Sequence, residues 1–164
     1  AEKIYLLRNY GQKEKYIHTL IAGNHRLDTL QAAILNIKLK YLEVWNKKRL
    51  EIAQKYVELL KNLPVITPQL PKKNTHVFHL FVVRVKKRKQ LNSFLKSNGI
   101  QCGIHYPIPI HLQPAYKDVL NSKESYPVAE ELSGEILSLP IYPELTDKQL
   151  KYIAGKIDEF FKKN

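Results

Sequence analysis

The sequence predicts a small α/β domain in which helices cover a sheet of about three strands, with one long helix before it. Three observations support this fold class. The 164 residues, 44% of them hydrophobic and 26% charged, suit about one globular domain. Apolar residues recur at helical spacing from residue 26 to residue 62. After Pro64, predicted strands and helices alternate, which is typical of a layered α/β structure.

The first residues favour the end of a helix. Ile4 and Leu7 lie among helix formers, and the segment 9–11 ends the helix. A helix that begins at residue 1 without a capping residue indicates that the chain was cut there. Because Gly11 to Asn24 has no clear apolar period, we expect a loop.

The long helix is predicted by two apolar rows. Spacings of three and four residues place the first row on one helix face: Leu27, Leu30, Ile34, Ile37, Tyr41 and Val44. A second row follows after a shift of one position: Trp45, Ile52, Tyr56 and Leu59. Asp28 and Gln31 resemble a capping box, and Pro64 ends the helix near Asn62. A helix of roughly 50 Å normally joins two lobes of a protein. We therefore expect this helix to bend near Lys47. The alternative is a self-contained helical hairpin.

Three strands are expected in the small C-terminal domain, residues 63–164. They cover residues 76–85, 100–105 and 137–141, where Pro140 and Pro143 confine the last to an edge. A short helix around Leu91, Phe94 and Leu95 ends at Gly99. The loop 106–111 holds two prolines, and an irregular helix over 112–121 follows.

Two further helices are expected near the end of the chain. Pro127 suits the first turn of a helix that runs to about Glu135. Thr146 and Gln149 form a capping box that starts the final helix. Its core face is predicted to carry Leu150, Ile153, Ile157 and Phe160.

Composition excludes several classes of protein. No apolar run approaches the roughly 20 residues of a membrane helix, and we expect no signal peptide. A single cysteine, Cys102, excludes an internal disulfide and a multi-cysteine zinc site. We interpret it as a small buried residue in a predicted strand and expect a reducing compartment, the cytoplasm.

The basic surplus points to anionic partners. The net charge of +12 suits nucleic acid, an anionic membrane surface or a phosphorylated small molecule. The basic residues occur in small groups, of which 86–89 is the densest, and these also fit a solvated surface. No zinc-finger, RRM or KH signature accompanies them.

The segment Gly23-Asn24-His25-Arg26 lies directly before the long helix. An asparagine amide and an arginine fork near a helix N-terminus are suited to binding an anion. The alternative is that Asn24 caps the helix and Arg26 is a surface charge.

The histidines offer a second candidate site. His105 and Tyr106 enter a loop stiffened by prolines, and His111 ends it, which is a common way to present functional groups. The alternative is that both histidines satisfy backbone groups in a turn. His76 and His79, at odd spacing in a predicted strand, point to opposite faces and cannot share a metal. The pattern predicts no metal site.

Several segments together resemble the DegT–DnrJ–StrS family of sugar-nucleotide aminotransferases. The residues from Gly23 to Leu35 look like the family's G-x-N-x-R-L-D-x-L-Q-A-A segment. Other similar segments follow in order: His76-Val77-Phe78-His79-Leu80, His105-Tyr106-Pro107-Ile108-Pro109-Ile110-His111, Tyr126-Pro127-Val128-Ala129-Glu130 and Leu137-Ser138-Leu139-Pro140. Nearly the whole chain is covered.

The resemblance implies the C-terminal portion of a longer fold-type I aminotransferase that uses pyridoxal phosphate. Residues 1–25 would be the tail of the large cofactor-binding domain and 26–62 the interdomain helix. The lysine that forms the Schiff base would lie outside this chain, so no catalytic residue is assigned and the fragment alone is expected to be inactive. The whole enzyme would transfer an amino group, from glutamate by analogy, to a keto-deoxy sugar on a nucleotide diphosphate.

The resemblance also implies roles for individual residues. Asn24 is similar to the asparagine that reaches the cofactor phosphate of the neighbouring subunit in the family homodimer, and Arg26 would support it. His105, Tyr106 and His111 would bind the nucleotide sugar. A different hypothesis is a stand-alone basic module that binds nucleic acid, with affinity that falls steeply with salt.

Overall fold

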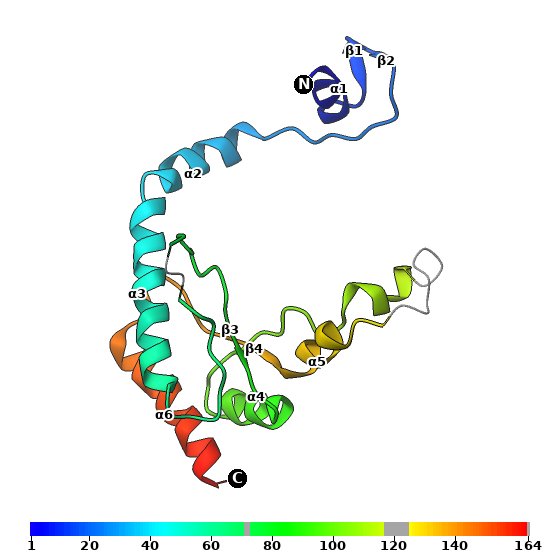
Figure 1. The fold of residues 1–164 in the computed structure, drawn as a ribbon. Coiled ribbons are helices and arrows are strands. Elements are labelled where there is room, and N and C mark those ends of the chain that lie inside the picture. The colour runs from blue at the N-terminus through cyan, green and yellow to red at the C-terminus, as the bar shows by residue number, and fades with distance from the viewer. Residues whose placement is uncertain (71–72, 117–124, 164) are drawn as a thin grey trace. The chain divides into compact units, whose positions relative to one another are not determined.

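The structure, a computed structural model, describes residues 1–70, 73–116 and 125–163 (Figure 1). The chain divides into two compact units, residues 1–42 and residues 43–164. Each unit is described by itself below.

The first unit begins with the expected helix, α1 (Glu2–Arg8). Two short strands, β1 (Gln12–Glu14) and β2 (Ile17–His18), then form an antiparallel hairpin. The expectation of a plain loop between Gly11 and Asn24 is therefore wrong. These strands are too short and too exposed to show the apolar alternation that marks a half-buried strand.

Two helices occupy the region predicted as one long helix. They are α2 (Thr29–Leu39) and α3 (Leu42–Leu60), and the break lies at Lys40–Tyr41, not near Lys47. The Lys40 amide donates to the Ile37 carbonyl and the Tyr41 amide to the Lys38 carbonyl. These hydrogen bonds span three residues, as in a 3-10 helix, so they tighten the last turn of α2 and end the helix.

The start of α2 also differs from the prediction in one detail. Asp28 is the N-cap residue, but its side chain makes no capping hydrogen bond. The capping box with Gln31 is therefore wrong, and Asn24, four residues earlier, does not cap this helix.

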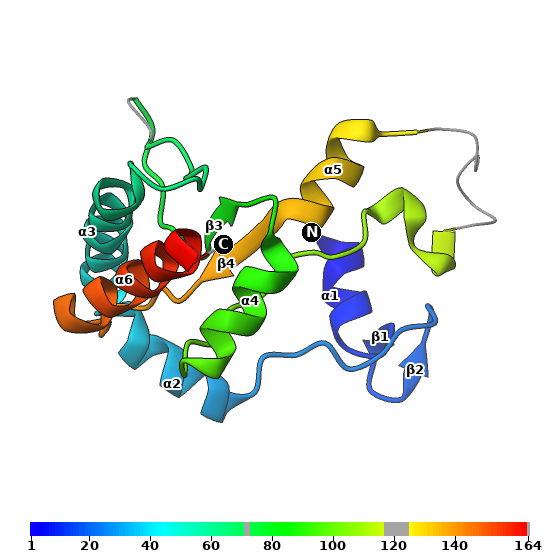
Figure 2. The same cartoon turned by 90° about the horizontal axis from the view of Figure 1, so that it is seen from below.

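The second unit holds β3 (Phe81–Arg84) and β4 (Ile136–Leu139), paired antiparallel with Phe81 opposite Leu139. Around them lie α4 (Arg88–Ser97), α5 (Pro127–Glu135) and α6 (Asp147–Lys163). Two 3-10 turns, η1 (Ile110–Leu112) and η2 (Pro114–Tyr116), follow the proline loop, and the rest of the helix expected over 112–121 lies outside the described residues. Figure 2 shows α4 and α6 side by side against the two strands.

The sheet is smaller than predicted. The segment 100–105 contributes one β-bridge, in which Gly103 and Ser138 exchange backbone hydrogen bonds of 3.0 and 2.8 Å. That bridge lies on the side of β4 away from β3, so Ser138 is not at an edge. On the other side, Ile66 bridges Arg84. The expected sheet of about three strands is thus one ladder of two strands with a single bridge on each side.

The first strand of the second unit starts five residues later than predicted, at Phe81. Phe78 adopts a positive φ of 46°, and its amide donates to His76 Nδ1 at 2.9 Å. This local bond competes with strand pairing. His76 and His79 consequently do not occupy opposite faces of a strand.

The core of the second unit forms where α3, α4 and α6 meet the strands. The Tyr56 ring stacks on Phe81 at 4.8 Å between centroids, and its hydroxyl donates to the Pro140 carbonyl at 2.9 Å. Burial raises the pKa of the Tyr56 hydroxyl. In the second apolar row, Leu60 is buried instead of the predicted Leu59. Cys102 is half-buried outside any strand, and burial raises the pKa of its thiol to about 11.

The last two helices follow the prediction closely. The predicted core face of α6 is buried: Leu150, Ile153, Ile157 and Phe160. The capping box is confirmed, with the Thr146 amide donating to Gln149 Oε1 at 3.0 Å and the Gln149 amide to Thr146 Oγ1 at 3.3 Å. Pro127 opens α5, and Gly99, with φ of 77°, follows α4 as expected.

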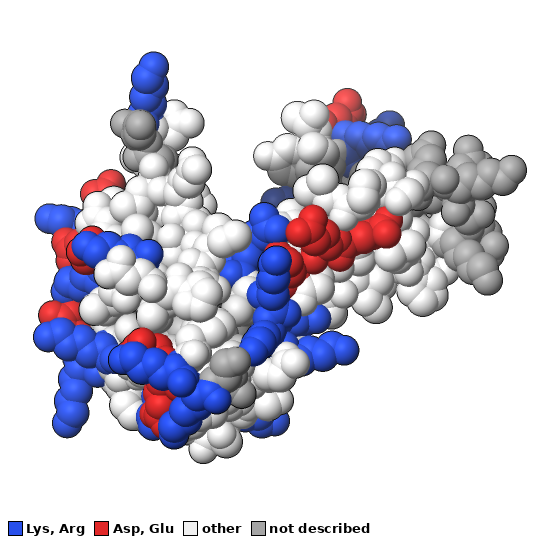
Figure 3. Space-filling view, turned by 60° about the horizontal axis from the view of Figure 1, so that its bottom comes forward, with Lys and Arg blue, Asp and Glu red and all other residues white. Residues whose placement is uncertain are grey.

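Charged groups are spread over the surface. On the face drawn in Figure 3, Lys and Arg side chains are interspersed with Asp and Glu. Within the described ranges, none of the helices combines the length and the apolarity that crossing a membrane requires.

Candidate functional site

Asn24 lies in an extended segment of the first unit, before α2. Its backbone forms a bridge with Asn9, and the next amide, that of His25, donates to the Arg8 carbonyl at 2.8 Å. These bonds hold the segment against the end of α1. The Asn24 side chain itself is exposed.

The Asn24 amide group is oriented by Arg26. Asn24 Oδ1 accepts from Arg26 Nε at 3.0 Å and from the Arg26 backbone amide at 3.3 Å. The guanidinium carbon of Arg26 lies 5.9 Å from the Tyr10 ring centroid. Because both bonds engage the oxygen, the Nδ2 group of Asn24 is left as a hydrogen-bond donor. The local geometry therefore fits an acceptor such as a phosphate oxygen.

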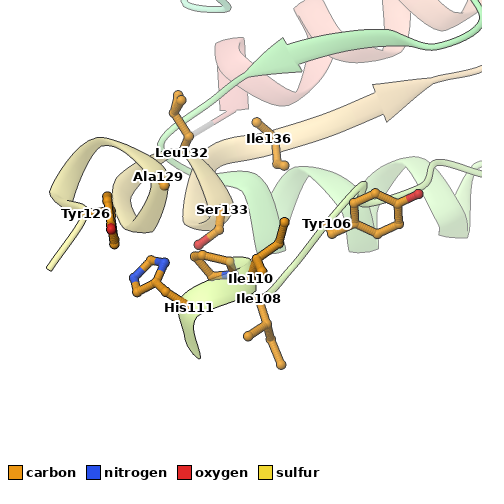
Figure 4. Close-up of a pocket in the computed structure, with 10 residues that line it drawn as sticks. Tyr106, Ile108, Ile110, His111, Tyr126, Ala129, Leu132, Ser133 and Ile136 are labelled. Carbon is orange, nitrogen blue, oxygen red and sulfur yellow. The ribbon is translucent and has the colours of Figure 1, made fainter. Parts of the chain in front are cut away.

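A cavity of about 520 Å³ lies in the second unit between the proline loop and α5. Its lining is mostly apolar and aromatic (Figure 4): Tyr106, Ile108, Pro109, Ile110, His111, Tyr126, Ala129, Leu132, Ser133 and Ile136. Concave apolar sites with a few polar groups are the usual form of small-molecule sites. Two of the predicted site residues, Tyr106 and His111, thus share one cavity.

His111 is fixed by Glu130 of α5. Its Nε2 lies 2.9 Å from Glu130 Oε1, and its ring lies 4.8 Å from that of Tyr126. Glu130 Oε1 also accepts from the Tyr126 amide at 3.0 Å and from Ser125 Oγ at 3.3 Å. The hydrogen bond from His111, followed by that from the Tyr126 amide, lowers the pKa of Glu130.

His105 occupies a different position from the other two. Its Nδ1 lies 2.9 Å from Ser138 Oγ, which is buried on β4. A Cβ at Gly103 would come within 2.4 Å of the His105 ring, so the ring rests on a position that has no side chain. His105 is not part of the cavity lining, and its role in substrate binding stays a prediction.

Sequence reasoning missed two residues that line this cavity, Tyr126 and Ser133, and a third, Glu130, that holds His111. Tyr126, Glu130 and Ser133 lie on or at the start of α5, 15 to 22 residues after His111. The segment that contains Tyr126 and Glu130 was part of the resemblance, but no spacing rule connects it to His111. Their contact depends on how α5 packs against the loop.

The part of the chain that the structure describes contains no group of three His, Cys, Asp or Glu residues able to hold a metal ion.

Comparison with known proteins gives consistent results. The family model for DegT/DnrJ/EryC1/StrS aminotransferases matches residues 1–158. The erythromycin biosynthesis sensory transduction protein EryC1 of Saccharopolyspora erythraea is 47% identical over 96% of this chain and 43% of its own length. The dTDP-3-amino-3,6-dideoxy-alpha-D-galactopyranose transaminase of Aneurinibacillus thermoaerophilus is 42% identical over 98% of this chain and 44% of its own.

Solved structures agree with the sequence relatives. The chain superposes on S. venezuelae DesV in complex with a ketimine intermediate with a TM-score of 0.88 and 39% identity, over 97% of this chain and 43% of that one. The chain spans less than half the length of each of these proteins. Since the family match runs through nearly every element described above, the chain belongs to the DegT/DnrJ/EryC1/StrS aminotransferase family.

Proposed function

We propose that this chain is the C-terminal portion of a pyridoxal-phosphate-dependent enzyme that transfers an amino group to a keto-deoxy sugar on a nucleotide diphosphate. The observation that carries the proposal is the 42% identity, over 98% of the chain, to a transaminase of a dTDP-linked deoxy sugar. Glutamate is the proposed amino donor, a homodimer the proposed assembly and the cytoplasm the proposed location.

Asn24 is the residue of this chain proposed to hold the cofactor. Its exposed amide, oriented by Arg26, has the donor that a phosphate dianion requires. In the homodimer it would reach the phosphate bound by the other subunit. When bound, pyridoxal phosphate supplies the electron sink for amino transfer, while the protein binds and orients the reactants.

The cavity beside α5 is the proposed place for part of the nucleotide sugar. Tyr106 and His111 line it, and the apolar walls would exclude water from the bound ligand. His105 would contribute from the neighbouring bridge at Ser138.

The variant Asn24→Asp in the full-length enzyme tests the cofactor role. Aspartate keeps the oxygen that accepts from Arg26 but loses the amide donor and places a negative charge beside the phosphate. A hydrogen bond to a charged group contributes about 1.5–3 kcal/mol, so the dissociation constant of the cofactor should rise by about 10- to 150-fold or more. Absorbance of bound pyridoxal phosphate during dilution measures this.

The matched control is Asn36→Asp, the same change at an exposed position of α2. It should leave both the cofactor affinity and the melting temperature unchanged. A lower melting temperature of Asn24→Asp with unaltered cofactor affinity would mean that Asn24 serves the fold only.

Separately, residues 1–164 alone should show no transaminase activity.

The nucleic-acid alternative receives less support. On the drawn face, lysines and arginines lie among carboxylates (Figure 3), and no nucleic-acid-binding signature accompanies them in the sequence. A steep loss of RNA or DNA affinity with rising salt would favour this alternative.

A further inference from the structure

Ser138 is a polar residue buried on the face of the ladder that points away from the core. Side chains alternate along β4, and the residues on either side of it, Leu137 and Leu139, belong to the core. The backbone amide and carbonyl of Ser138 are both bonded to Gly103. Because Ser138 is only 4% exposed, its hydroxyl needs a hydrogen-bond partner within the protein.

His105 is that partner. Ser138 Oγ lies 2.9 Å from His105 Nδ1, and among the described residues the hydroxyl makes no other hydrogen bond. If Nδ1 carried the hydrogen, it would donate to Oγ, and the hydroxyl hydrogen of Ser138 would be buried without an acceptor, which is costly. The hydroxyl therefore donates to Nδ1, and the hydrogen of the neutral ring lies on Nε2.

Gly103 fixes the position of the same ring from a second side. A Cβ at Gly103 would lie 2.4 Å from His105 Cε1, 3.2 Å from Nδ1 and 3.3 Å from Nε2. The ring edge between the two nitrogens thus rests on the one residue type that has no side chain. His105 is exposed, and within the described ranges no hydrogen bond reaches its Nε2. The ring therefore presents one hydrogen-bond donor, Nε2–H, that is left for a ligand.

We propose that Ser138 is a positioning residue whose buried hydroxyl holds His105 against Gly103 as the Nε2–H tautomer, so that Nε2–H donates to an acceptor oxygen of the bound nucleotide sugar. Ser138 acts only through His105. The contact between His105 and the nucleotide sugar rests on the proposed function, whereas the two contacts of the ring with Ser138 and Gly103 rest on the geometry alone.

Imidazole ¹⁵N chemical shifts of His105 in the full-length holoenzyme test these two contacts. The wild type should show the Nε2–H form, and Ser138→Ala should show a mixture of tautomers. Ser138→Cys, with a weak S–H donor, should fall between them. Gly103→Ala should also change the shifts because its methyl group displaces the ring. The control is Gly155→Ala, at a position of α6 that faces open space, and it should leave the shifts unchanged.

A double-mutant cycle separates positioning from a purely structural role. Binding of dTDP-glucose and UDP-glucose to the full-length holoenzyme is measured by calorimetry. Ser138→Ala should weaken binding by about 3- to 10-fold, the effect of one hydrogen bond, and His105→Ala by at least as much. Adding Ser138→Ala to His105→Ala should have no further effect, because the ring through which Ser138 acts is then absent.

Three results would overturn the proposal. The same loss of affinity from Ser138→Ala with and without the His105 ring would mean that Ser138 does not act through His105. Unchanged shifts in Ser138→Ala, even with a lower melting temperature, would mean that the hydroxyl does not set the tautomer. Unaltered binding in His105→Ala would contradict the proposed function of His105 and the positioning role with it, while the chemical shifts would still report the contact with Ser138.

Discussion

Arg49 connects three separate segments of the second unit through one guanidinium nitrogen. Its Nη1 donates to the carbonyl of Ile141 at 2.9 Å and to those of Phe78 and His79 at 3.3 Å. These carbonyls precede β3 and follow β4, which is the same end of this antiparallel ladder, so α3 is attached to both strands at that end. Such carbonyls have no strand partner and need a donor from elsewhere.

Arg49→Ala should therefore destabilise the fold. Hydrogen bonds to a charged group contribute about 1.5–3 kcal/mol, and a loss of that size in the free energy of unfolding is expected. Urea unfolding measures it. Lys48→Ala, the exposed neighbour on α3, is the control and should change stability by less than about 0.5 kcal/mol. Equal losses in both variants would contradict the bridging role.

Replacing Arg88 should have the opposite effect and increase the stability of the fold. It lies on the buried face of α4 with Leu91 and Leu95, and its side-chain atoms Nε and Nη1 find no hydrogen-bond partner among the described residues. Buried donors without a partner cost about 1–3 kcal/mol each. Arg88→Met should raise the free energy of unfolding by a comparable amount, with exposed Lys89→Met unchanged. A loss of stability in Arg88→Met would show that the guanidinium is paired in solution.

At the scale of the element, α6 is stabilised along its last turns by ion pairs around Glu159. Its carboxylate lies 2.7 Å from Lys156 Nζ and 2.7 Å from Lys163 Nζ. The hydrogen bonds from Lys156 and Lys163, in that order, lower the pKa of Glu159 from 4.5 to about 2. Spacings of three and four residues on a helix favour such pairs.

This lowered pKa predicts a specific pH dependence. The stabilising contribution of Glu159 is fully present above its unfolded pKa and is lost as the pH falls from about 4.5 toward 2. The stability difference between wild type and Glu159→Gln should therefore be constant near pH 7 and vanish near pH 2. Unfolding curves at several pH values measure this difference. A difference that persists at pH 2 would exclude the ionised Glu159 carboxylate as its source.

The elements divide into those that sequence pattern can predict and those that it cannot. The helices α4 and α6 were predictable because buried Leu, Ile and Phe recur at helical spacing. The strand predicted from residue 76 has the right composition, but the bond from Phe78 to His76 replaces strand pairing up to Phe81. The proposed site residue Asn24 could be picked out from a local sequence pattern. Glu130 could not, because its contact with His111 arises only when α5 packs on the proline loop.

At the scale of the whole chain, the first apolar row remains exposed in the structure. Leu27, Leu30 and Ile34 are 61%, 74% and 51% exposed. Contiguous apolar surface of this kind is seldom left in water. We therefore expect this row to pack against another copy of the chain or another part of the enzyme.

Ile34→Glu tests this expectation. Residues 1–164 produced alone should sediment as species larger than the 19.2 kDa monomer, and Ile34→Glu should shift them toward the monomer because the charge opposes burial. Asn36→Glu, which lies on a different face of α2, carries the same added charge and should leave association unchanged. A strictly monomeric wild type at high concentration would count against the expectation.

The shared acceptor at Glu130 links the first turn of α5 to the contents of the neighbouring cavity. One carboxylate oxygen receives both the Tyr126 amide and the His111 ring. By thermodynamic linkage, a molecule that immobilises His111 also stabilises the hydrogen bond of that amide. Deuterium should then replace the Tyr126 amide hydrogen more slowly as the cavity fills, so a backbone amide at the start of α5 would report occupancy of the cavity.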